Sequence, residues 1–312
     1  MAASKTDATT PPRRLLRKRS LLLIGSVPAI FAFACWRLTE PFESLRADPG
    51  LNPSIADVPK VEAIAVSKPS VVWPVNRLEG DAAKSLLLDV LDVATDRLSH
   101  VSGYTATFRK QERLKGRLGP VQTLAMKVRH QPFALYLKFL SPQAGKEVVY
   151  AEGRHDNKLI AHSGGFSRLL VPRLAVPPDH PLALLDSRHP VTEAGLANLA
   201  ARLVKFRKMD LTDADAETIL DRVTDAEGQD WLRSVHLHTV RDDTRPFAKI
   251  EVLYEPKTFI PMRIRNFDWP APGQGIELPL AEHYIYDKVD FDSQLSARDF
   301  DPANPEYAFH RY

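Results

Sequence analysis

Residues 101 to 162 read VSGYTATFRKQERLKGRLGPVQTLAMKVRHQPFALYLKFLSPQAGKEVVYAEGRHDNKLIAH. Apolar and polar side chains alternate in short segments of this stretch, and glycine-containing turns separate the segments. Alternation with a period of two is typical of strands that bury one face, and the short spacing favours hairpins between neighbours. We therefore expect antiparallel strands at 104–109, 124–128, 133–140, 147–152 and 158–161.

An amphipathic helix precedes these strands. Between Asp81 and Val101, apolar residues recur at intervals of three and four, which places them on one side of a helix. Asp81 is expected to be the N-cap and Gly103 to stop the helix. A helix followed by a strand meander predicts an α+β fold, in which a curved antiparallel sheet forms an incomplete β-barrel and helices cover its concave side.

The stretch 164–190 interrupts the alternation with closely spaced prolines and leucines. Such a segment is neither a helix nor a central strand. It is either a loop packed down on the domain or a lid over an apolar cavity, because long irregular loops are often binding loops. A second helix is expected at 192–208, and strands at 220–224, 231–241, 247–254, 261–267 and 283–290. The aromatic tail 300–312 is expected to pack on the sheet edge.

The first 36 residues carry the features of an export signal. Six lysines and arginines precede the uncharged segment Ser20–Trp36, as in a signal peptide or a short membrane anchor with its basic end in the cytoplasm. Cleavage after Ala34, lipidation of Cys35 and retention as an anchor all remain open, as do general and twin-arginine export. The expected location is the periplasm or cell envelope, tethered to the inner membrane through residues 20–36 or released from it.

The rest of the chain divides into a proline-rich linker over 37–78 and one folded domain over 79–312. Beyond residue 35 there are 36 basic and 38 acidic residues, so the high isoelectric point belongs to the leader. A nearly neutral domain has no electrostatic reason to bind nucleic acid. The single cysteine, Cys35, excludes an intrachain disulfide and a multi-cysteine metal site.

Several segments resemble the bacterial lipoprotein-carrier (LolA/LolB-like) superfamily. The matching segments are VSGYTATF at 101–108, RHQPFALYLKF at 129–139, EVVYAEGRHDNKL at 147–159 and IEVLYEPKTFIPMRI at 250–264. The segments 280–292 and 298–309 are similar to an uncharacterised exported family of that type, found mainly in planctomycetes. The resemblance covers roughly residues 80–312, and it implies a half-barrel whose helices close a cavity for acyl chains.

The resemblance also assigns one site residue. In the carriers, an arginine just before the proline of the third strand latches the helical lid, and Arg129 holds the matching position. This chain has His130 and Gln131 between that arginine and Pro132, which shifts the register of the latch. The alternative is an arginine at a strand end that bonds to nearby carbonyl groups.

Motifs for catalysis or metal binding are weak. His236 and His238 could share a metal on one side of a strand, but no third ligand accompanies them, and we expect Val235 and Leu237 to point inward and the histidines to face solvent. Glu147 and Glu152 fall on opposite faces of a strand. No nucleophile elbow, phosphate loop or dinucleotide motif occurs, so neither an enzyme nor a cofactor is expected.

The sequence therefore predicts an envelope protein that binds an acyl chain or a lipidated protein, acting as an acceptor or a sensor. The alternative is a structural or interaction module of the envelope with a filled core and no ligand. Burial of apolar surface would drive binding. The candidate cavity residues are Tyr104, Ala106, Phe108, Leu124, Met126, Val128, Phe133, Leu135, Leu137, Ile250 and Val252.

Overall fold

The computed structural model describes residues 71–165, 173–241, 243–270 and 277–309. The predicted leader, Cys35 and most of the predicted linker lie outside these residues. Across the described ranges, no helix combines the length and the apolarity needed to cross a membrane.

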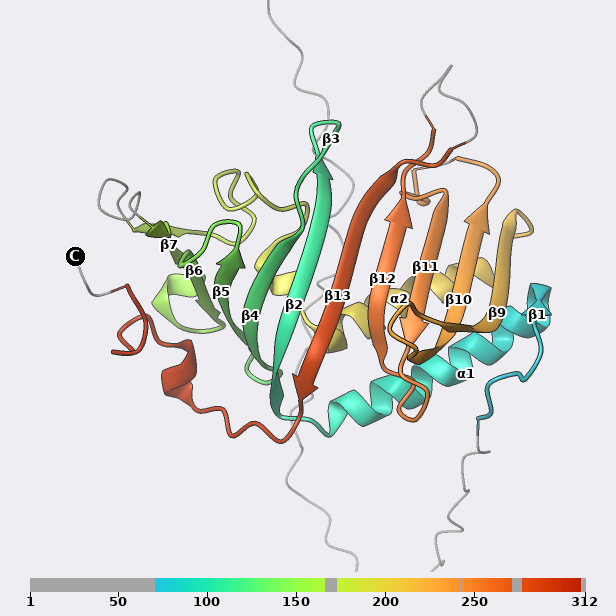
Figure 1. The fold of residues 1–312 in the computed structure, drawn as a ribbon, viewed down its shortest axis with the longest axis horizontal. Coiled ribbons are helices and arrows are strands. Elements are labelled where there is room, and N and C mark those ends of the chain that lie inside the picture. Colours follow the sequence, from blue (N-terminus) through green and yellow to red (C-terminus); the bar gives the residue numbers. More distant parts are fainter. Residues whose placement is uncertain (1–70, 166–172, 242, 271–276, 310–312) are drawn as a thin grey trace, which may run out of the picture. The chain divides into compact units, whose positions relative to one another are not determined.

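The described strands form one antiparallel sheet of thirteen strands (Figure 1). Their order across the sheet is β1-β9-β10-β11-β12-β13-β2-β4-β5-β6-β7-β8, with the short β3 beside β2. The strands are β1 Leu78–Glu79, β2 Gly103–Leu114, β3 Arg117–Leu118, β4 Gln122–Arg129, β5 Ala134–Ser141, β6 Glu147–Ala151, β7 Leu159–His162, β8 Leu174–Val176, β9 Ala216–Thr224, β10 Asp230–His238, β11 Lys249–Tyr254, β12 Pro261–Phe267 and β13 Leu280–Asp290. Because β1 and β8 are its two edges, the sheet is open, as predicted.

The sheet consists of two consecutive meanders. One runs from β2 to β8 and the other from β9 to β13, so nearly all neighbours in the sheet are also neighbours in sequence. The meanders join where β13 pairs with β2, with Ile285 opposite Arg109. The strand β1 then extends the far edge by pairing with β9. This arrangement confirms the strand order expected from the hairpin spacing.

Two α-helices, α1 Gly80–Ser99 and α2 Leu196–Asp210, lie against one face of the sheet. Short 3₁₀ helices occur at His155–Asn157, Val191–Glu193 and Ala297–Phe300. The N-cap of α1 is Glu79 rather than the predicted Asp81, and the helix ends before Gly103. Gly103 instead begins β2, where an added Cβ would lie 2.5 Å from the carbonyl oxygen of Val128. Close approach of two strands, and not the end of a helix, is what requires this glycine.

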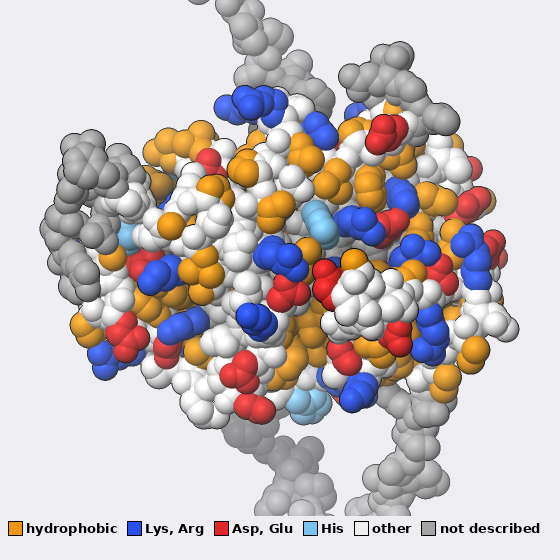
Figure 2. Space-filling view, viewed as in Figure 1, with side chains coloured by type: hydrophobic (Ala, Val, Ile, Leu, Met, Phe, Trp, Pro, Cys, Tyr) orange, Lys and Arg blue, Asp and Glu red, His pale blue; other side chains and the backbone are white. Residues whose placement is uncertain are grey.

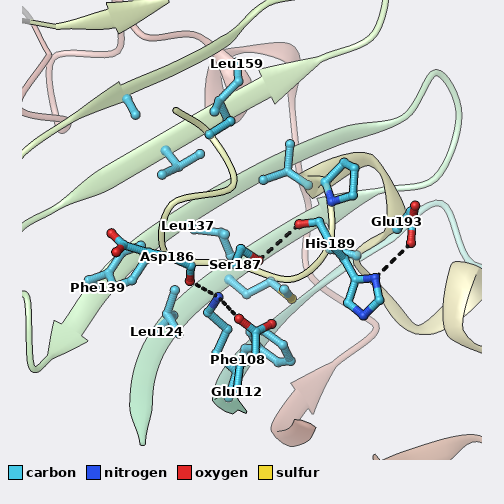
Figure 3. Close-up of a pocket in the computed structure, with 18 of the residues that line it drawn as sticks. Phe108, Glu112, Leu124, Leu137, Phe139, Leu159, Asp186, Ser187, His189 and Glu193 are labelled. Carbon is cyan, nitrogen blue, oxygen red and sulfur yellow. Dashed lines mark hydrogen bonds and ion pairs between the residues drawn. The ribbon is translucent and has the colours of Figure 1, made fainter. Parts of the chain in front are cut away.

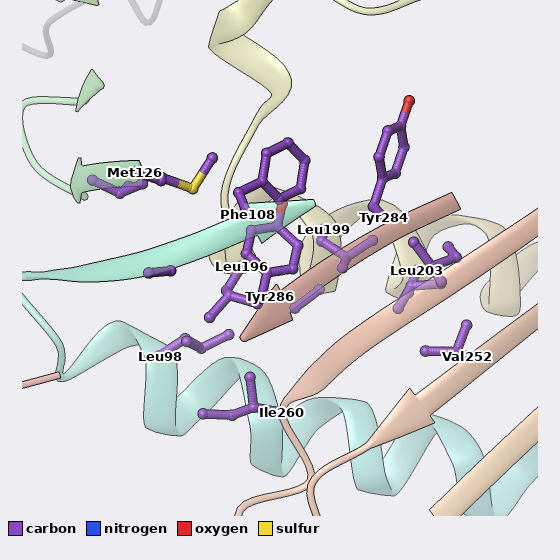
Figure 4. Packing of buried hydrophobic residues seen from close by; sticks show 14 of the residues in the cluster. Leu98, Phe108, Met126, Leu196, Leu199, Leu203, Val252, Ile260, Tyr284 and Tyr286 are labelled. Atoms are coloured by element: carbon purple, nitrogen blue, oxygen red, sulfur yellow. The ribbon is translucent and has the colours of Figure 1, made fainter. Parts of the chain in front are cut away.

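The main hydrophobic core lies between the helices and the concave face of the sheet (Figure 4). Leu87, Leu91 and Leu98 of α1 are fully buried, and the apolar side of α2 faces the same layer through Leu196, Leu199 and Leu203. Removing each leucine from water contributes on the order of 1.5–3 kcal/mol. The heptad-like stripes of the two helices therefore account for their positions on the sheet.

The fold begins before the predicted boundary at residue 79. Trp73, placed by the sequence in the linker, is only 2% exposed. Its Nε1 donates a hydrogen bond to the carbonyl oxygen of Asp221, and its ring centroid lies 5.6 Å from that of Tyr254. Neighbouring prolines hide this residue from a search for periodicity, although a buried aromatic ring is a strong anchor.

The C-terminal segment packs on the outer face of the sheet, and not on its edge as predicted. Tyr307 stacks on Tyr136 at 4.0 Å between ring centroids, and Lys127 pairs with Asp299 at 2.6 Å. A second hydrophobic cluster results from Ala134, Tyr136, Val149, Ala151, Ile160, Phe300, Tyr307 and Phe309. Strands β5 to β7 are consequently buried on both faces.

Candidate functional site: an apolar cavity with a charged end

A cavity of about 150 Å³ lies between the concave face of β2 and β4 to β8 and the segment 177–191 (Figure 3). We call it the first cavity. Its apolar walls are Phe108, Leu124, Met126, Leu137, Phe139, Val148, Leu159, Ala161, Leu174, Leu182, Leu199 and Tyr286. The strand residues among them point to the same side because they occupy alternate positions. The proline-rich segment provides the opposite wall, which is where the lid interpretation places it.

Charged residues gather at one end of the first cavity. Lys110 continues the inward row of β2 and is 8% exposed. Its Nζ lies 3.1 Å from Glu112 Oε2 and donates to the carbonyl oxygen of Asp186 at 3.0 Å. Burial lowers the pKa of Lys110, and the nearby Glu112 carboxylate partly opposes that shift. A buried ammonium group thus ties the loop to the sheet.

The loop is fastened to the sheet at a second group of polar side chains. His189 Nε2 lies 2.8 Å from Glu282 Oε2, and Arg188 Nη1 donates to the carbonyl oxygen of Arg113. Burial of Glu282 opposes its ionisation, but the hydrogen bond and charge of His189, the hydrogen bond from Asn266 and the charge of Arg202 together hold the pKa of that carboxyl below its ordinary value. Tyr284 stands between Glu112 and Glu282, within hydrogen-bond distance of both carboxylates.

This arrangement matches the shape of an amphiphile. Apolar side chains line most of the cavity, while the charged groups are confined to the end near Lys110 and His189. The volume resembles that of an engineered cavity that accepts benzene, and it lies below the roughly 300–1,000 Å³ of drug-sized sites. A long chain would therefore require the segment 177–191 to move outward.

The predicted cavity residues fall into three groups. Phe108, Leu124, Met126 and Leu137 line the first cavity. Tyr104, Ala106, Val128, Leu135 and Val252 are buried in the core against the helices. Phe133 and Ile250 are partly buried at the margin of that core, and Ile250 also lines a second cavity of about 290 Å³. His189, Glu193 and Arg202 border both cavities.

Arg129 lies at the end of β4 on the outer face. Its Nε donates to the carbonyl oxygen of Pro132 at 3.0 Å, and its guanidinium group lies 5.2 Å from the ring centroid of Phe300. These contacts match the alternative interpretation of an arginine at a strand end, and they do not support a latch on the loop. Within the described part of the chain, Lys110, Arg188 and His189 make the contacts expected of such a latch.

The prediction that His236 and His238 face solvent is wrong. His236 is fully buried, with Nδ1 3.1 Å from Thr218 Oγ1 and Nε2 3.0 Å from Ser234 Oγ. Burial lowers its pKa well below the ordinary value, and the charge of Arg207 adds to the effect. The inward row of β10 is polar at this point, so alternation alone selected the wrong face. Among described residues, no three or more His, Cys, Asp or Glu side chains are grouped to hold a metal.

The charged end was missed because sequence reasoning followed only apolar positions. Lys110 and Glu112 continue the row of Tyr104, Ala106 and Phe108, so their spacing already placed them on the concave face. Buried charges that extend an apolar row are unusual and mark candidate sites. That pattern was the available signal.

Comparisons with known proteins give one family match. The family model described as "Protein of unknown function (DUF1571)" matches residues 101–309. A search of curated proteins found no significant match.

Comparison with solved structures gives partial similarities at low sequence identity. A DUF1329 family protein from Desulfovibrio piger is 10% identical with a TM-score of 0.34, over 68% of this chain and 96% of that one. A putative outer membrane lipoprotein-sorting protein domain from Vibrio parahaemolyticus is 11% identical with a TM-score of 0.32, over 68% and 95%. A LolA superfamily protein from Nitrosomonas europaea is 10% identical with a TM-score of 0.32, over 68% and 96%.

Proposed function

We propose a binding function for this chain, which belongs to the DUF1571 family of proteins of unknown function. In this proposal the protein holds the acyl chain of a lipid or of a lipidated protein in the first cavity, without catalysing a reaction. The observation that carries the proposal is the first cavity itself, with apolar walls and charges at one end only. The carrier-like segments noted in the sequence imply the same class of ligand.

Apolar burial supplies the driving force. Each methylene group that leaves water contributes about 0.8 kcal/mol, so affinity should rise with chain length until the cavity is full. The segment 177–191, which follows β8, is suited to yield, because it exposes 49% of Leu182 and 58% of Leu185 and makes polar contacts with the sheet through Asp186 and Arg188. Its outward movement would lengthen the apolar trough and give these leucines a ligand to contact.

The cell envelope is the proposed location, on the strength of the predicted leader. A protein retained there by residues 20–36 would remain at the membrane and not shuttle freely. Such a tether fits an acceptor or a sensor of lipidated proteins better than a soluble carrier.

A structural role without a ligand is the second candidate. The observation favouring it is the filled part of the concave face, where Tyr104, Val128 and Val252 are completely buried. The two candidates differ in whether the first cavity takes up an apolar molecule, which is directly measurable.

The test uses the full chain, purified as the producing cell processes it. Native mass spectrometry should reveal copurified lipid, and the uncharged probe N-phenyl-1-naphthylamine should bind and be displaced by decanoate. The variant Leu137→Trp fills the first cavity and should weaken probe binding about tenfold or more, whereas Leu253→Trp on the outer face should leave it unchanged. Ala161→Leu adds a smaller side chain to the same cavity, and its thermal unfolding is compared with that of the wild type to check that the fold is kept. Absence of both lipid and probe binding in the wild type would favour the structural role.

A further inference from the structure

The second cavity is apolar in its walls but unusually rich in arginine. Its volume is about 290 Å³, and it lies beside the first cavity, sharing His189, Glu193 and Arg202 with it. Its apolar lining is Leu203, Phe206, Pro246, Phe247, Ile250 and Ile264, and its cationic lining is Arg188, Arg202, Arg207 and Arg245. Glu193 is the one acidic residue among the described residues that line it.

Arg207 and Arg245 are almost completely buried, at 3% and 5% exposure. Arg245 makes two hydrogen bonds to Asp213 Oδ2, through Nε at 3.0 Å and Nη2 at 2.7 Å, and Arg207 Nη1 lies 3.1 Å from Asp210 Oδ2. Arg207 Nη1 and Asp210 Oδ2 form an ion pair without hydrogen-bond geometry, and within the described residues Arg207 Nε and Arg245 Nη1 have no hydrogen-bond partner. Each arginine is therefore held by an aspartate and still has free donors.

Buried donors without acceptors are costly, and native structures normally satisfy them. The two unpaired donors belong to two buried arginines that line the same cavity, and the oxygens of an anion bound there would satisfy them. Guanidinium groups fit the paired oxygens of a carboxylate or a phosphate through parallel hydrogen bonds. Burial lowers the pKa of Arg207, the charge of Arg245 adds to the shift, and the charge of Asp210 partly opposes it.

The boundary between the two cavities is made of side chains that can separate. His189 Nδ1 lies 3.3 Å from Glu193 Oε2, and Arg202 Nη1 lies 3.8 Å from the same oxygen. The side chains of Glu193 and His189 are already partly exposed, so their rearrangement would expose little additional buried surface to water. A ligand could therefore extend from the first cavity into the second along this boundary.

We propose that the second cavity binds the anionic group of the same amphiphile whose apolar chain occupies the first cavity, with Arg207 and Arg245 as its donors. The ligand class is a long-chain carboxylate or phosphate monoester or diester. This inference rests on the proposed function, because it assumes that the first cavity takes the chain. It assigns a head-group specificity that apolar burial cannot provide.

The experiment measures displacement of N-phenyl-1-naphthylamine from the full chain by three ligands with one chain length: decanoate, decyl phosphate and decan-1-ol. The wild type should bind at least one anion about tenfold or more tightly than the alcohol. Decanoate and decyl phosphate separate the two sources of the anionic group. In Arg207→Met and Arg245→Met, the preference for anion over alcohol should fall to about threefold or less, with alcohol binding retained.

Controls keep the outcome interpretable. Arg233→Met removes an arginine that pairs with Asp221 on the outer face and lines neither cavity, so it should keep the wild-type preference. Arg207→Lys and Arg245→Lys keep the positive charge but lose the paired donors of the guanidinium group. They replace the methionine variants in the same measurement if those variants unfold. Equal binding of anions and alcohol by the wild type overturns the inference and leaves the proposed function intact. A preference that survives in both arginine variants also overturns it, whereas failure of all three ligands to bind rejects the proposed function.

Discussion

Against β9 to β12, the concave face of the sheet is covered by α1 and α2, which leave the second cavity between α2 and β10 to β12. Against β4 to β7, it borders the first cavity and is covered by the segment 177–191. The outer faces show the reverse. The C-terminal segment covers β5 to β7, while the outer face of β9 to β13 displays ion pairs such as Arg233 with Asp221 and Arg263 with Asp225 (Figure 2). The helices thus cover the concave face of one half, and the C-terminal segment covers the outer face of the other.

This difference shows how a cavity coexists with a stable sheet. Strands β5 to β7 lose packing where the first cavity lies, and they regain it from Phe300, Tyr307 and Phe309 on the other side. The half whose concave face is covered by α1 and α2 has charged side chains on its outer face. Stability and binding are therefore assigned to opposite faces of the same strands.

The largest loss of stability is expected from truncating a core side chain of α1. Leu91→Ala in α1 removes a fully buried side chain and should lower the free energy of unfolding by about 3–4 kcal/mol, because the helix cannot collapse onto the space left. Leu174→Ala beside the first cavity should cost about 1 kcal/mol or less, because space already adjoins it. Urea unfolding of both variants gives the comparison, and equal losses would contradict the difference between a leucine packed under α1 and one beside the first cavity.

The outer cover of β5 to β7 should come next. Tyr307→Ala removes the ring stacked on Tyr136 and should lower the free energy of unfolding by about 3 kcal/mol. Tyr307→Phe keeps the ring but loses the hydrogen bond that its hydroxyl donates to the carbonyl oxygen of Asp299, so about 1 kcal/mol should be lost. Thermal unfolding measures both. A Tyr307→Ala variant as stable as wild type would mean that the tail adds nothing to this half.

A buried carboxylate on β13, where the halves meet, should make stability depend on pH. The pKa of Glu282 is held below its ordinary value, so its ionised form stabilises the fold above that value, and the contribution is lost as the pH falls through the folded-state pKa. Glu282→Gln should therefore cost about 2 kcal/mol at pH 7 and progressively less below about pH 4.3. Urea titrations of wild type and variant at pH 7, 5 and 3 test this. If the difference in their free energies of unfolding does not change with pH, the charge of the carboxylate does not contribute to stability.

The smallest effect is expected on the open outer face. Arg233 and Asp221 are partly exposed, with 2.8 Å between Arg233 Nε and Asp221 Oδ1. Arg233→Met should lower the free energy of unfolding by less than about 1 kcal/mol, and the difference should shrink at high salt because surface charges are screened. Unfolding at low and high ionic strength measures it; a loss as large as that of Tyr307→Ala would show that the ion pairs also hold the sheet together.

Much of the fold could be predicted because each strand buries mainly one face. Alternation located β2, β4 and β9 to β13 within a few residues, and helical spacing located α1 and α2. Periodicity failed where a segment far away in the sequence buries a residue. Val148 and Val149 are buried on opposite faces of β6, because a distant C-terminal segment covers the outer one, and Trp73 is anchored by a strand far along the chain.

The candidate site was predicted less completely for a related reason. Phe108, Leu124, Met126 and Leu137 were found because they are apolar and alternate, but the same criterion also selected Tyr104 and Val128, which α2 covers. Whether an inward residue meets a helix or empty space depends on where the helices end. The partners of Lys110, Arg207 and Arg245 are set by tertiary contacts that no local pattern contains.

The pairing of β13 with β2 has a consequence for how the chain folds. Within each meander, all strand pairings join strands that follow one another in sequence, so each meander can assemble by forming local hairpins. The pairing of Tyr286 with Phe108 joins residues from opposite ends of the domain and carries most of the loop-closure entropy, together with β1 on β9. The pairing of β13 with β2 should therefore form late in folding. Variants within this pairing should change the refolding rate less than variants within the hairpins.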